Sequence, residues 1–322
     1  DPFLQNNELT SEERAALLKA VALNVSAHNS QIPRPKFFLQ VNSLSHLTEE
    51  ELRKRNGARN ASIGEDGLDP FTFNDDSRRL EETLPESVDW SQTGAVTKVK
   101  NQQQCGCCWA LATVGAIEAA VWRTTNETFQ EDLSWQQLIS CDNDNGGCNG
   151  GNVLTALQYT EDENVIGGMT SLSDYPFTDD GGTTTKECTL DQKELAVDVI
   201  KLGLAVSSTD PSDVDDRVTR IKEVLSKTPM AVLMSANCNT FYNYQKGIMT
   251  DDGGCSCNSG NCIDHAVLMV GYDDTTNPAS FKIKNSWGTG WGESGYFRIA
   301  QTVDQSTMQY GLFGLLYQAS GA

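Results

Sequence analysis

Apolar residues in the first third of the chain recur at helical spacing in one long stretch and one short one. Residues 8–29 are predicted to form a helix, because apolar side chains recur every three or four positions after Thr10 and two acidic residues. Residues 48–57 are predicted to form a second helix, with acids first, bases last and a glycine stop. Residues 37–41 are a strand candidate. Residues 58–82 are polar and aperiodic, as in an extended linker.

The rest of the chain changes from helical to strand-like spacing of its apolar residues. Residues 109–120 are small or apolar and rich in helix formers, and residues 133–141 and 214–225 also repeat at helical spacing. From residue 231 onwards, short apolar runs are separated by Gly, Asp and Asn, as in a barrel of short strands. These runs are residues 231–234, 265–272, 280–284 and 295–299. The pattern therefore predicts an α+β protein.

The strongly acidic charge excludes one class of function. The 322 residues carry a formal net charge of −20, whereas a nucleic-acid-binding protein needs a basic face. The charge fits a protein that works in acid, where protonation of carboxylates relieves self-repulsion; good solubility is the simpler alternative. No apolar run is long enough to span a bilayer, and the first residues lack a signal-peptide pattern. We therefore expect neither nucleic acid nor membrane as a partner.

The cysteines and sequons point to an oxidising compartment. All ten cysteines lie between Cys105 and Cys262, and so local a density suggests disulfide bonds. Three sequons for N-glycosylation occur, at Asn24, Asn60 and Asn126. Together these features favour passage through the secretory pathway.

Cys108 is the strongest candidate for a chemically active residue, because it stands directly before the predicted helix 109–120. A thiol at a helix N-terminus feels the positive end of the helix dipole, which favours the thiolate. A nearby histidine would make it a good nucleophile. The chain has three histidines, His28, His46 and His265, so a catalytic histidine must be one of them. A buried or disulfide-bonded cysteine is the alternative interpretation.

Two motifs around these residues resemble those of papain-like cysteine proteases. The first is Gln-Gln-Gln-Cys-Gly-Cys-Cys-Trp at 102–109, which matches the active-site signature except that Cys107 replaces Ser or Ala. The second is Lys-Asn-Ser-Trp-Gly-Thr-Gly-Trp-Gly at 284–292. The resemblance implies a papain-like two-lobe fold, with a helical left lobe and a β-barrel-like right lobe. It also implies an endopeptidase that hydrolyses peptide bonds in a cleft between the lobes.

The resemblance assigns four catalytic residues. Cys108 is the nucleophile, and His265 is its partner in a thiolate–imidazolium pair. Asn285 would accept a hydrogen bond from a His265 ring nitrogen and fix its tautomer, with Trp287 shielding that bond. Gln102 would donate to the developing oxyanion together with the Cys108 backbone amide. No cofactor and no metal are expected.

The N-terminal part resembles a propeptide of the cathepsin L-like branch of the family. Residues 1–83 are expected to be an inhibitory propeptide and residues 84–322 the mature peptidase domain, which starts at a family-like Leu-Pro-Glu-Ser-Val-Asp-Trp. The resemblance implies a zymogen whose partners are its own propeptide, peptide or protein substrates and cystatin-like inhibitors. It implies a lysosomal, vacuolar or secreted protein that is activated in acid. An inert homologue that only binds is the alternative.

His46 stands where the family's second propeptide motif has Asp. Because histidine titrates near endosomal pH, we hypothesise that protonation of His46 loosens the propeptide as the pH falls.

The resemblance also predicts the substrate cleft. Gly150 and Gly151 lie in a glycine-rich turn that would wall it. The positions that match the main specificity pocket form an apolar well with a neutral polar end, so an aliphatic or aromatic substrate residue is expected there. The residues expected to contact substrate are Gly150, Gly151, Val153, Leu233, Ile263, Asp264, Ala266, Trp287 and Gln318.

The resemblance suggests two disulfides, Cys105–Cys148 and Cys141–Cys188. A third family disulfide cannot form, because Phe313 stands at the place of its second cysteine. The five remaining cysteines besides Cys108 must pair differently, locally or with Cys238, and their odd number leaves one thiol over. These are Cys107, Cys238, Cys255, Cys257 and Cys262.

The loop before His265 has a rival interpretation. Cys255, Cys257 and Cys262 stand with His265 at spacings that a zinc site could use. A zinc ion there would take His265 as a ligand and abolish the protease activity.

Overall fold

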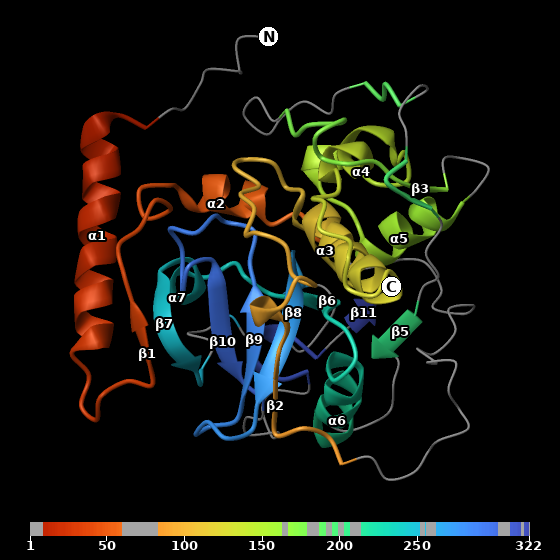
Figure 1. Cartoon of the computed structure of the whole chain (residues 1–322). Coiled ribbons are helices and arrows are strands. Elements are labelled where there is room, and N and C mark those ends of the chain that lie inside the picture. The colour runs from red at the N-terminus through yellow and green to blue at the C-terminus, as the bar shows by residue number, and fades with distance from the viewer. Residues whose placement is uncertain are drawn as a thin grey trace.

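A computed structural model describes most of the chain and shows a helical part beside a large sheet, with α1 (Ser11–Asn29) and β1 (Phe37–Leu39) on the side of the sheet away from the helical part and α2 (Glu49–Arg55) above the sheet (Figure 1). The described residues are 9–59, 83–162, 167–178, 187–190, 195–198, 203–206, 214–251, 255, 262–301, 310–316 and 319–321. Within them, no helix combines the length and apolarity needed to cross a membrane.

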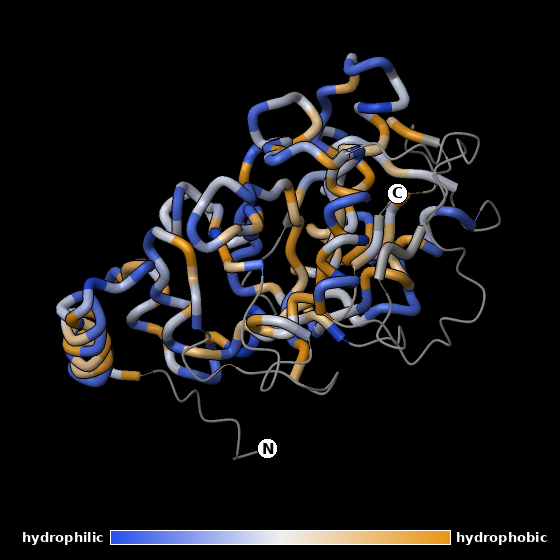
Figure 2. The backbone as a smooth tube through the Cα atoms, turned by 90° about the horizontal axis from the view of Figure 1, so that it is seen from below, coloured by the Kyte–Doolittle hydropathy of each residue, from blue (hydrophilic) through white to orange (hydrophobic). Residues whose placement is uncertain are grey.

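The N-terminal elements follow the predicted order. α1 (Ser11–Asn29) and α2 (Glu49–Arg55) each begin after a threonine N-cap whose side chain forms a capping box with a glutamate three positions later. The cap places the start of α1 later than predicted, and α2 ends before its glycine, with Asn56 as C-cap. Between them lies β1 (Phe37–Leu39). α1 buries none of its residues and stands at the margin of the molecule (Figure 2).

The helical part is built around α3 (Cys108–Thr124), which is buried along almost its whole length. α3 packs against α4 (Trp135–Cys141) and α5 (Val153–Glu161) on one side and against the sheet on the other. The approach to the sheet is close at Gly115, where an added Cβ would lie 3.0 Å from a Leu268 side-chain carbon. The predicted helices 109–120 and 133–141 are thus present.

The sheet has nine strands among the described residues, and its main path runs β1-β7-β10-β9-β8-β6-β11-β5, with β2 paired to β8. All pairs are antiparallel except β10 with β7. The strands after β1 are β2 (Ser87–Asp89), β5 (Gly203–Val206), β6 (Met230–Met234), β7 (Tyr244–Met249), β8 (His265–Asp273), β9 (Ser280–Lys284), β10 (Tyr296–Ala300) and β11 (Ala319–Gly321). The remaining strands and α-helices are a two-stranded sheet of β3 (Gly168–Met169) and β4 (Val197–Asp198), and the helices α6 (Val214–Leu225) and α7 (Asn239–Tyr242).

An aromatic cluster around Phe241 forms part of a larger apolar core. Its ring lies within 5.5 Å, centroid to centroid, of the rings of Trp287, Trp291, Phe297 and Phe313. Phe313 is fully buried. Phe313, at the place where the resemblance expects a cysteine, therefore anchors the C-terminal segment by packing.

We predict that Phe313→Ala lowers the free energy of unfolding by about 3–5 kcal/mol, because it removes a buried ring and leaves a cavity. Urea unfolding of the full chain measures this, with Leu23→Ala as the control, since Leu23 is 64% exposed. A loss below about 1 kcal/mol would show that the aromatic contacts of Phe313 contribute little.

Candidate active site

Cys108 is the first residue of α3, and its side chain is fully buried. Its Sγ accepts a hydrogen bond from the backbone amide of Gly57 at 3.3 Å. Burial raises the pKa of the thiol to about 11, and the charge of Asp264 acts in the same direction, against backbone hydrogen bonds that include Ala266. The thiol is therefore neutral in this form of the protein.

His265 opens β8 and is also fully buried. Its Nε2 lies 2.8 Å from Asn285 Oδ1, and because an amide oxygen can only accept, Nε2 carries the hydrogen. Nδ1 is left without a hydrogen-bond partner among the described residues, available for a proton. Trp287 stacks on the imidazole with a centroid distance of 4.9 Å, and burial lowers the pKa of His265 to about 4.

α3 and the sheet bring Cys108 and His265 to the same place. Ala266 directly follows His265 in β8, and its backbone is hydrogen-bonded to the Cys108 sulfur. The sequence separates these residues widely, and each stands at the start of its element.

Gln102 is fully buried beside them. Its Nε2 donates to the carbonyl oxygen of Arg55 at 2.7 Å and to that of Cys105 at 2.8 Å. Its Oε1 accepts from Ser286 Oγ at 2.5 Å, which fixes which end of the amide faces the site. The Arg55 carbonyl thus already occupies a donor expected to serve an oxyanion.

After α2 ends at Arg55, residues 56–59 run through this site as a non-helical segment. Ala58 forms a parallel bridge with Gly151, and its amide donates to the Asp264 carbonyl at 2.9 Å. Gly151 donates to the Gly57 carbonyl and accepts from the Arg59 amide, both at 2.8 Å. Only glycine fits at position 57, because an added Cβ would lie 1.8 Å from a backbone oxygen. The segment leaves no room for another chain over Cys108.

Asp264 contacts both the N-terminal segment and the sheet. Its Oδ2 accepts from Asn56 Nδ2 at 3.2 Å, and its Oδ1 accepts from the Ala236 amide at 2.7 Å. Asn56 Nδ2 also donates to Tyr242 Oη at 2.8 Å. Burial raises the pKa of Asp264 to about 6.

The described residues of the expected specificity pocket gather in one apolar cluster. Ala58 of the N-terminal segment lies in the same cluster. The pocket residues in it are Val153, Leu233, Ile263 and Ala266, all at most 6% exposed. Gln318 lies outside the described residues.

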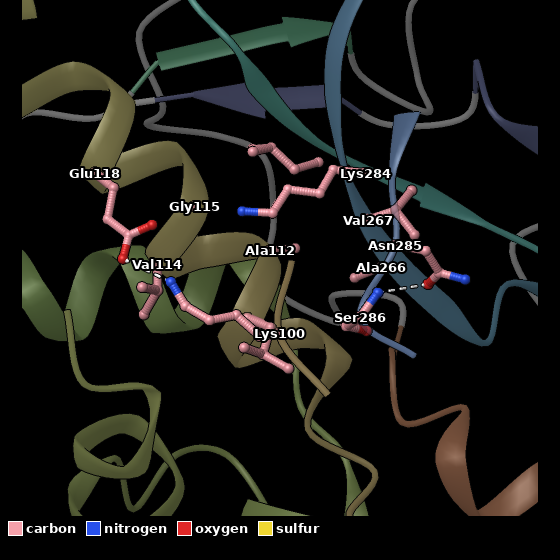
Figure 3. Close-up of a pocket in the computed structure, with 12 residues that line it drawn as sticks. Lys100, Ala112, Val114, Gly115, Glu118, Ala266, Val267, Lys284, Asn285 and Ser286 are labelled. Carbon is pink, nitrogen blue, oxygen red and sulfur yellow. Dashed lines mark hydrogen bonds and ion pairs between the residues drawn. The ribbon is translucent and has the colours of Figure 1, made fainter. Parts of the chain in front are cut away.

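A cavity lies between α3 and the strands β8 and β9, close to Asn285 (Figure 3). Lys284 lines it and donates to Thr97 Oγ1 at 3.2 Å, and burial lowers its pKa to about 8. Lys100 bridges Glu118 at 3.3 Å and Asp132 at 2.6 Å. Sequence reasoning missed this charged cluster; only the position of Lys284 before Asn285 pointed to it.

The disulfides contradict the zinc interpretation. Cys255 is bonded to Cys238, and Cys262 is disulfide-bonded as well, so neither is available as a thiolate ligand. Cys257 lies outside the described residues, within which no group of three or more potential metal-ligating side chains occurs. His265 is held by Asn285 instead.

Two further disulfides join the pairs that the resemblance suggested, Cys105–Cys148 and Cys141–Cys188. Cys107 and Cys108 are both buried thiols outside any disulfide. Of the sequons, Asn24 and Asn126 are exposed, and Asn60 lies outside the described residues.

Comparison with protein families and relatives agrees with this geometry. The family model described as papain family cysteine protease matches residues 84–313. The senescence-specific cysteine protease of Arabidopsis thaliana is 34% identical over 300 residues, which cover 91% of this chain and 79% of that protein.

Two solved structures that resemble this chain are a procathepsin and a protease bound to E-64. The digestive procathepsin L2 proteinase from the larval midgut of Tenebrio molitor aligns with a TM-score of 0.82 at 25% identity, covering 98% of this chain and 95% of its own. A cysteine protease of Carica candamarcensis in complex with E-64 aligns with a TM-score of 0.61 at 32% identity, covering 74% of this chain and 98% of its own.

Proposed function

Because the chain belongs to the papain family of cysteine proteases, we propose that Cys108, His265, Asn285 and Gln102 are its catalytic residues and that residues 1–83 are the propeptide that blocks them. One observation carries the proposal. A single backbone segment donates to the Cys108 sulfur from Gly57 and accepts from the Gln102 amide at Arg55. Residues 84–322 are then the mature enzyme, an endopeptidase.

Catalysis begins when the propeptide has left and water or substrate enters. The Cys108 proton passes to His265 Nδ1, and the thiolate attacks the carbonyl carbon of the scissile bond. The resulting oxyanion accepts from the Cys108 amide and from Gln102 Nε2, at the positive end of α3. His265 then gives its proton to the leaving amine, which leaves an acyl-enzyme. Water, deprotonated by His265, hydrolyses the thioester and restores Cys108.

The propeptide suppresses this chemistry electrostatically as well as sterically. Burial holds the pKa of Cys108 near 11 and that of His265 near 4, so both groups are neutral between those pH values. Readmitting water removes much of the cause of both shifts, which favours the thiolate and the imidazolium. Asn285 holds the imidazole in place throughout.

Acid-dependent activation is supported by an ion pair inside the propeptide. Arg14 of α1 donates to both carboxylate oxygens of Glu51 in α2, at 2.8 and 3.2 Å, and this contact lowers the pKa of Glu51 to about 2. A carboxyl group with a lowered pKa stabilises the fold above its ordinary pKa, and that contribution is lost as the pH falls from about 4.5 towards 2. The hypothesis that protonation of His46 loosens the propeptide stays a prediction. The backbone carbonyl oxygen of His46 also accepts a hydrogen bond from Arg14.

The exposed sequons and the disulfides support a glycosylated protein of the lysosome, vacuole or extracellular space. Peptides and proteins are its substrates, and cystatin-like proteins would compete for the same cleft. E-64, bound to the Carica relative, serves as a probe of Cys108.

We predict that acid treatment removes the propeptide and makes Cys108 reactive towards E-64, whereas the untreated zymogen reacts slowly because the thiol is covered and neutral.

Gln102→Ala should lower kcat/KM of the processed enzyme by about 10²–10³, since one oxyanion donor is lost. Mass spectrometry of the labelled protein and peptide hydrolysis measure these effects.

Cys108→Ser should remove labelling, and Gln104→Ala, a change of a half-buried neighbouring glutamine, should leave kcat/KM nearly unchanged. A processed protein that neither labels nor hydrolyses peptides would be an inert binder.

We predict that substrates with Leu, Val or Phe one residue before the residue donating the scissile carbonyl are preferred about tenfold or more over those with Arg, because the pocket is apolar. A peptide library measures the ratio of kcat/KM values. Leu233→Ala, which widens the pocket, should shift the preference towards Phe. Strong selection of Arg would contradict the assignment of the pocket.

We predict that Glu51→Gln speeds self-processing at pH 5–6 and flattens its pH dependence below about 4.5, because the titrating partner of Arg14 is gone. Loss of the propeptide is followed by gel electrophoresis over time at each pH. Glu50→Gln is the control, since Glu50 belongs to the same helix and pairs with Lys54 at an exposed site. Parallel profiles for Glu51→Gln and the unmodified zymogen would exclude this pair from activation.

A further inference from the structure

Strand β7 loses one of its two neighbouring strands when the propeptide is removed. In the zymogen, β1 pairs antiparallel with β7, placing Phe37 opposite Gly247 and Leu39 opposite Tyr244. β1 is the terminal strand of the sheet path and lies on the side away from α3 (Figure 1). Removal of residues 1–83, which the proposed function requires, therefore turns β7 into an edge strand with unpaired backbone groups.

The edge of β7 is held by residues that remain in the mature enzyme. The Gly247 amide donates to Glu293 Oε1 at 2.9 Å, and Tyr244 Oη donates to the Gly247 carbonyl at 2.6 Å. Arg298 in turn donates to both carboxylate oxygens of Glu293, at 2.7 and 2.9 Å. None of these contacts involves the propeptide, so the strand stays formed without it.

The departing strand also leaves an apolar slot. Phe37 is 1% exposed and Leu39 7% exposed, both packed in the core cluster with Tyr244 and Ile248. Phe38, between them, is only half-buried and lies 5.8 Å from the Lys246 ammonium, measured to its ring centroid. The slot therefore accepts an aromatic residue and an aliphatic one two positions later.

Gly247 allows the close approach of an incoming backbone. It has a φ of +101°, and an added Cβ would lie 2.4 Å from the Lys36 carbonyl oxygen and 2.6 Å from the Phe37 Cα. The absence of a side chain here is thus needed for the strand pairing itself.

α7 is contacted both by the segment that follows β1 and by the segment that covers the catalytic site. The Tyr242 carbonyl oxygen accepts a hydrogen bond from Asn42, which follows β1. The Tyr242 hydroxyl accepts one from Asn56, which directly precedes Gly57 over Cys108. The ring of Phe241 lies 6.5 Å from that of His265. One chain covers both places in the zymogen, so one substrate chain can reach both.

We propose that in the processed enzyme the edge of β7 is a second docking site, separate from the catalytic cleft, for an extended segment of a protein substrate that carries an aromatic–x–aliphatic pattern. Strand addition gives affinity through main-chain hydrogen bonds, and the slot gives specificity through alternate side chains. The site would favour long substrates over short peptides that fill only the cleft.

Binding is tested on zymogen that has been processed in acid and then blocked with E-64, so that the cleft is occupied and maturation is verified independently. The probe is a fluorescent synthetic peptide of residues 34–45, followed by anisotropy. The Phe37→Ala peptide should bind about ten- to hundredfold more weakly, because it loses a buried ring. The Phe38→Ala peptide, changed at the half-buried position, should stay within about threefold.

A pair of fluorogenic substrates tests the consequence for catalysis. Both contain the same scissile sequence, and one carries residues 34–45 on a flexible Gly/Ser linker. The long substrate should have a KM about tenfold lower, and its Phe37→Ala form should match the short one. In the enzyme, Gly247→Ala should remove the advantage, with Gly290→Ala as control because an added Cβ there meets open space.

Peptide binding that is absent up to about 1 mM on verified, E-64-blocked enzyme would overturn the docking site and leave the protease assignment intact. Equal binding of the Phe37→Ala and Phe38→Ala peptides would overturn it as well. Failure to process or to take up E-64 would instead count against the proposed function.

Discussion

The burial of one thiol and one imidazole beneath the same backbone segment is the constraint on which the zymogen depends. A charged group loses hydration when it is buried, so the dry site favours the neutral forms of Cys108 and His265. The segment supplies an amide to the sulfur and a carbonyl to Gln102, and so occupies the groups that the reaction would use. The proposed catalytic residues are thus brought together, while Cys108 and His265 are both kept neutral.

The fold positions this site at the ends of regular elements. Cys108 begins α3, His265 begins β8 and Asn285 directly follows β9. The regular backbone of these elements therefore fixes the position from which each side chain starts. Behind them, Lys100 and Glu118 lie on the helical side of a cavity and Lys284 on the sheet side. Burial disfavours the charged form of Lys284.

The sequence predicted the main helices and strands, because these rest on local patterns, and it named the candidate catalytic residues, whose roles remain a proposal. Helical spacing located α3 and α6, and the motif strings located Cys108 and Asn285. It could not predict which backbone groups of the N-terminal segment meet the site, because the pattern marked Arg55 and Gly57 only as the end of a helix. It also left the pairing of Cys255 open, since the choice between Cys238, a local partner and zinc depends on distances that only the folded chain sets.

Phe313 gives the molecule a property that its relatives' usual disulfide would not. A thiol protease works only while its nucleophile is reduced, and the same reductants open accessible disulfide bonds. At this position the C-terminal segment is held by packed aromatic rings, which carry no sulfur. The attachment of the C-terminal segment therefore does not depend on redox potential. A reducing environment that keeps the catalytic thiol active does not weaken it.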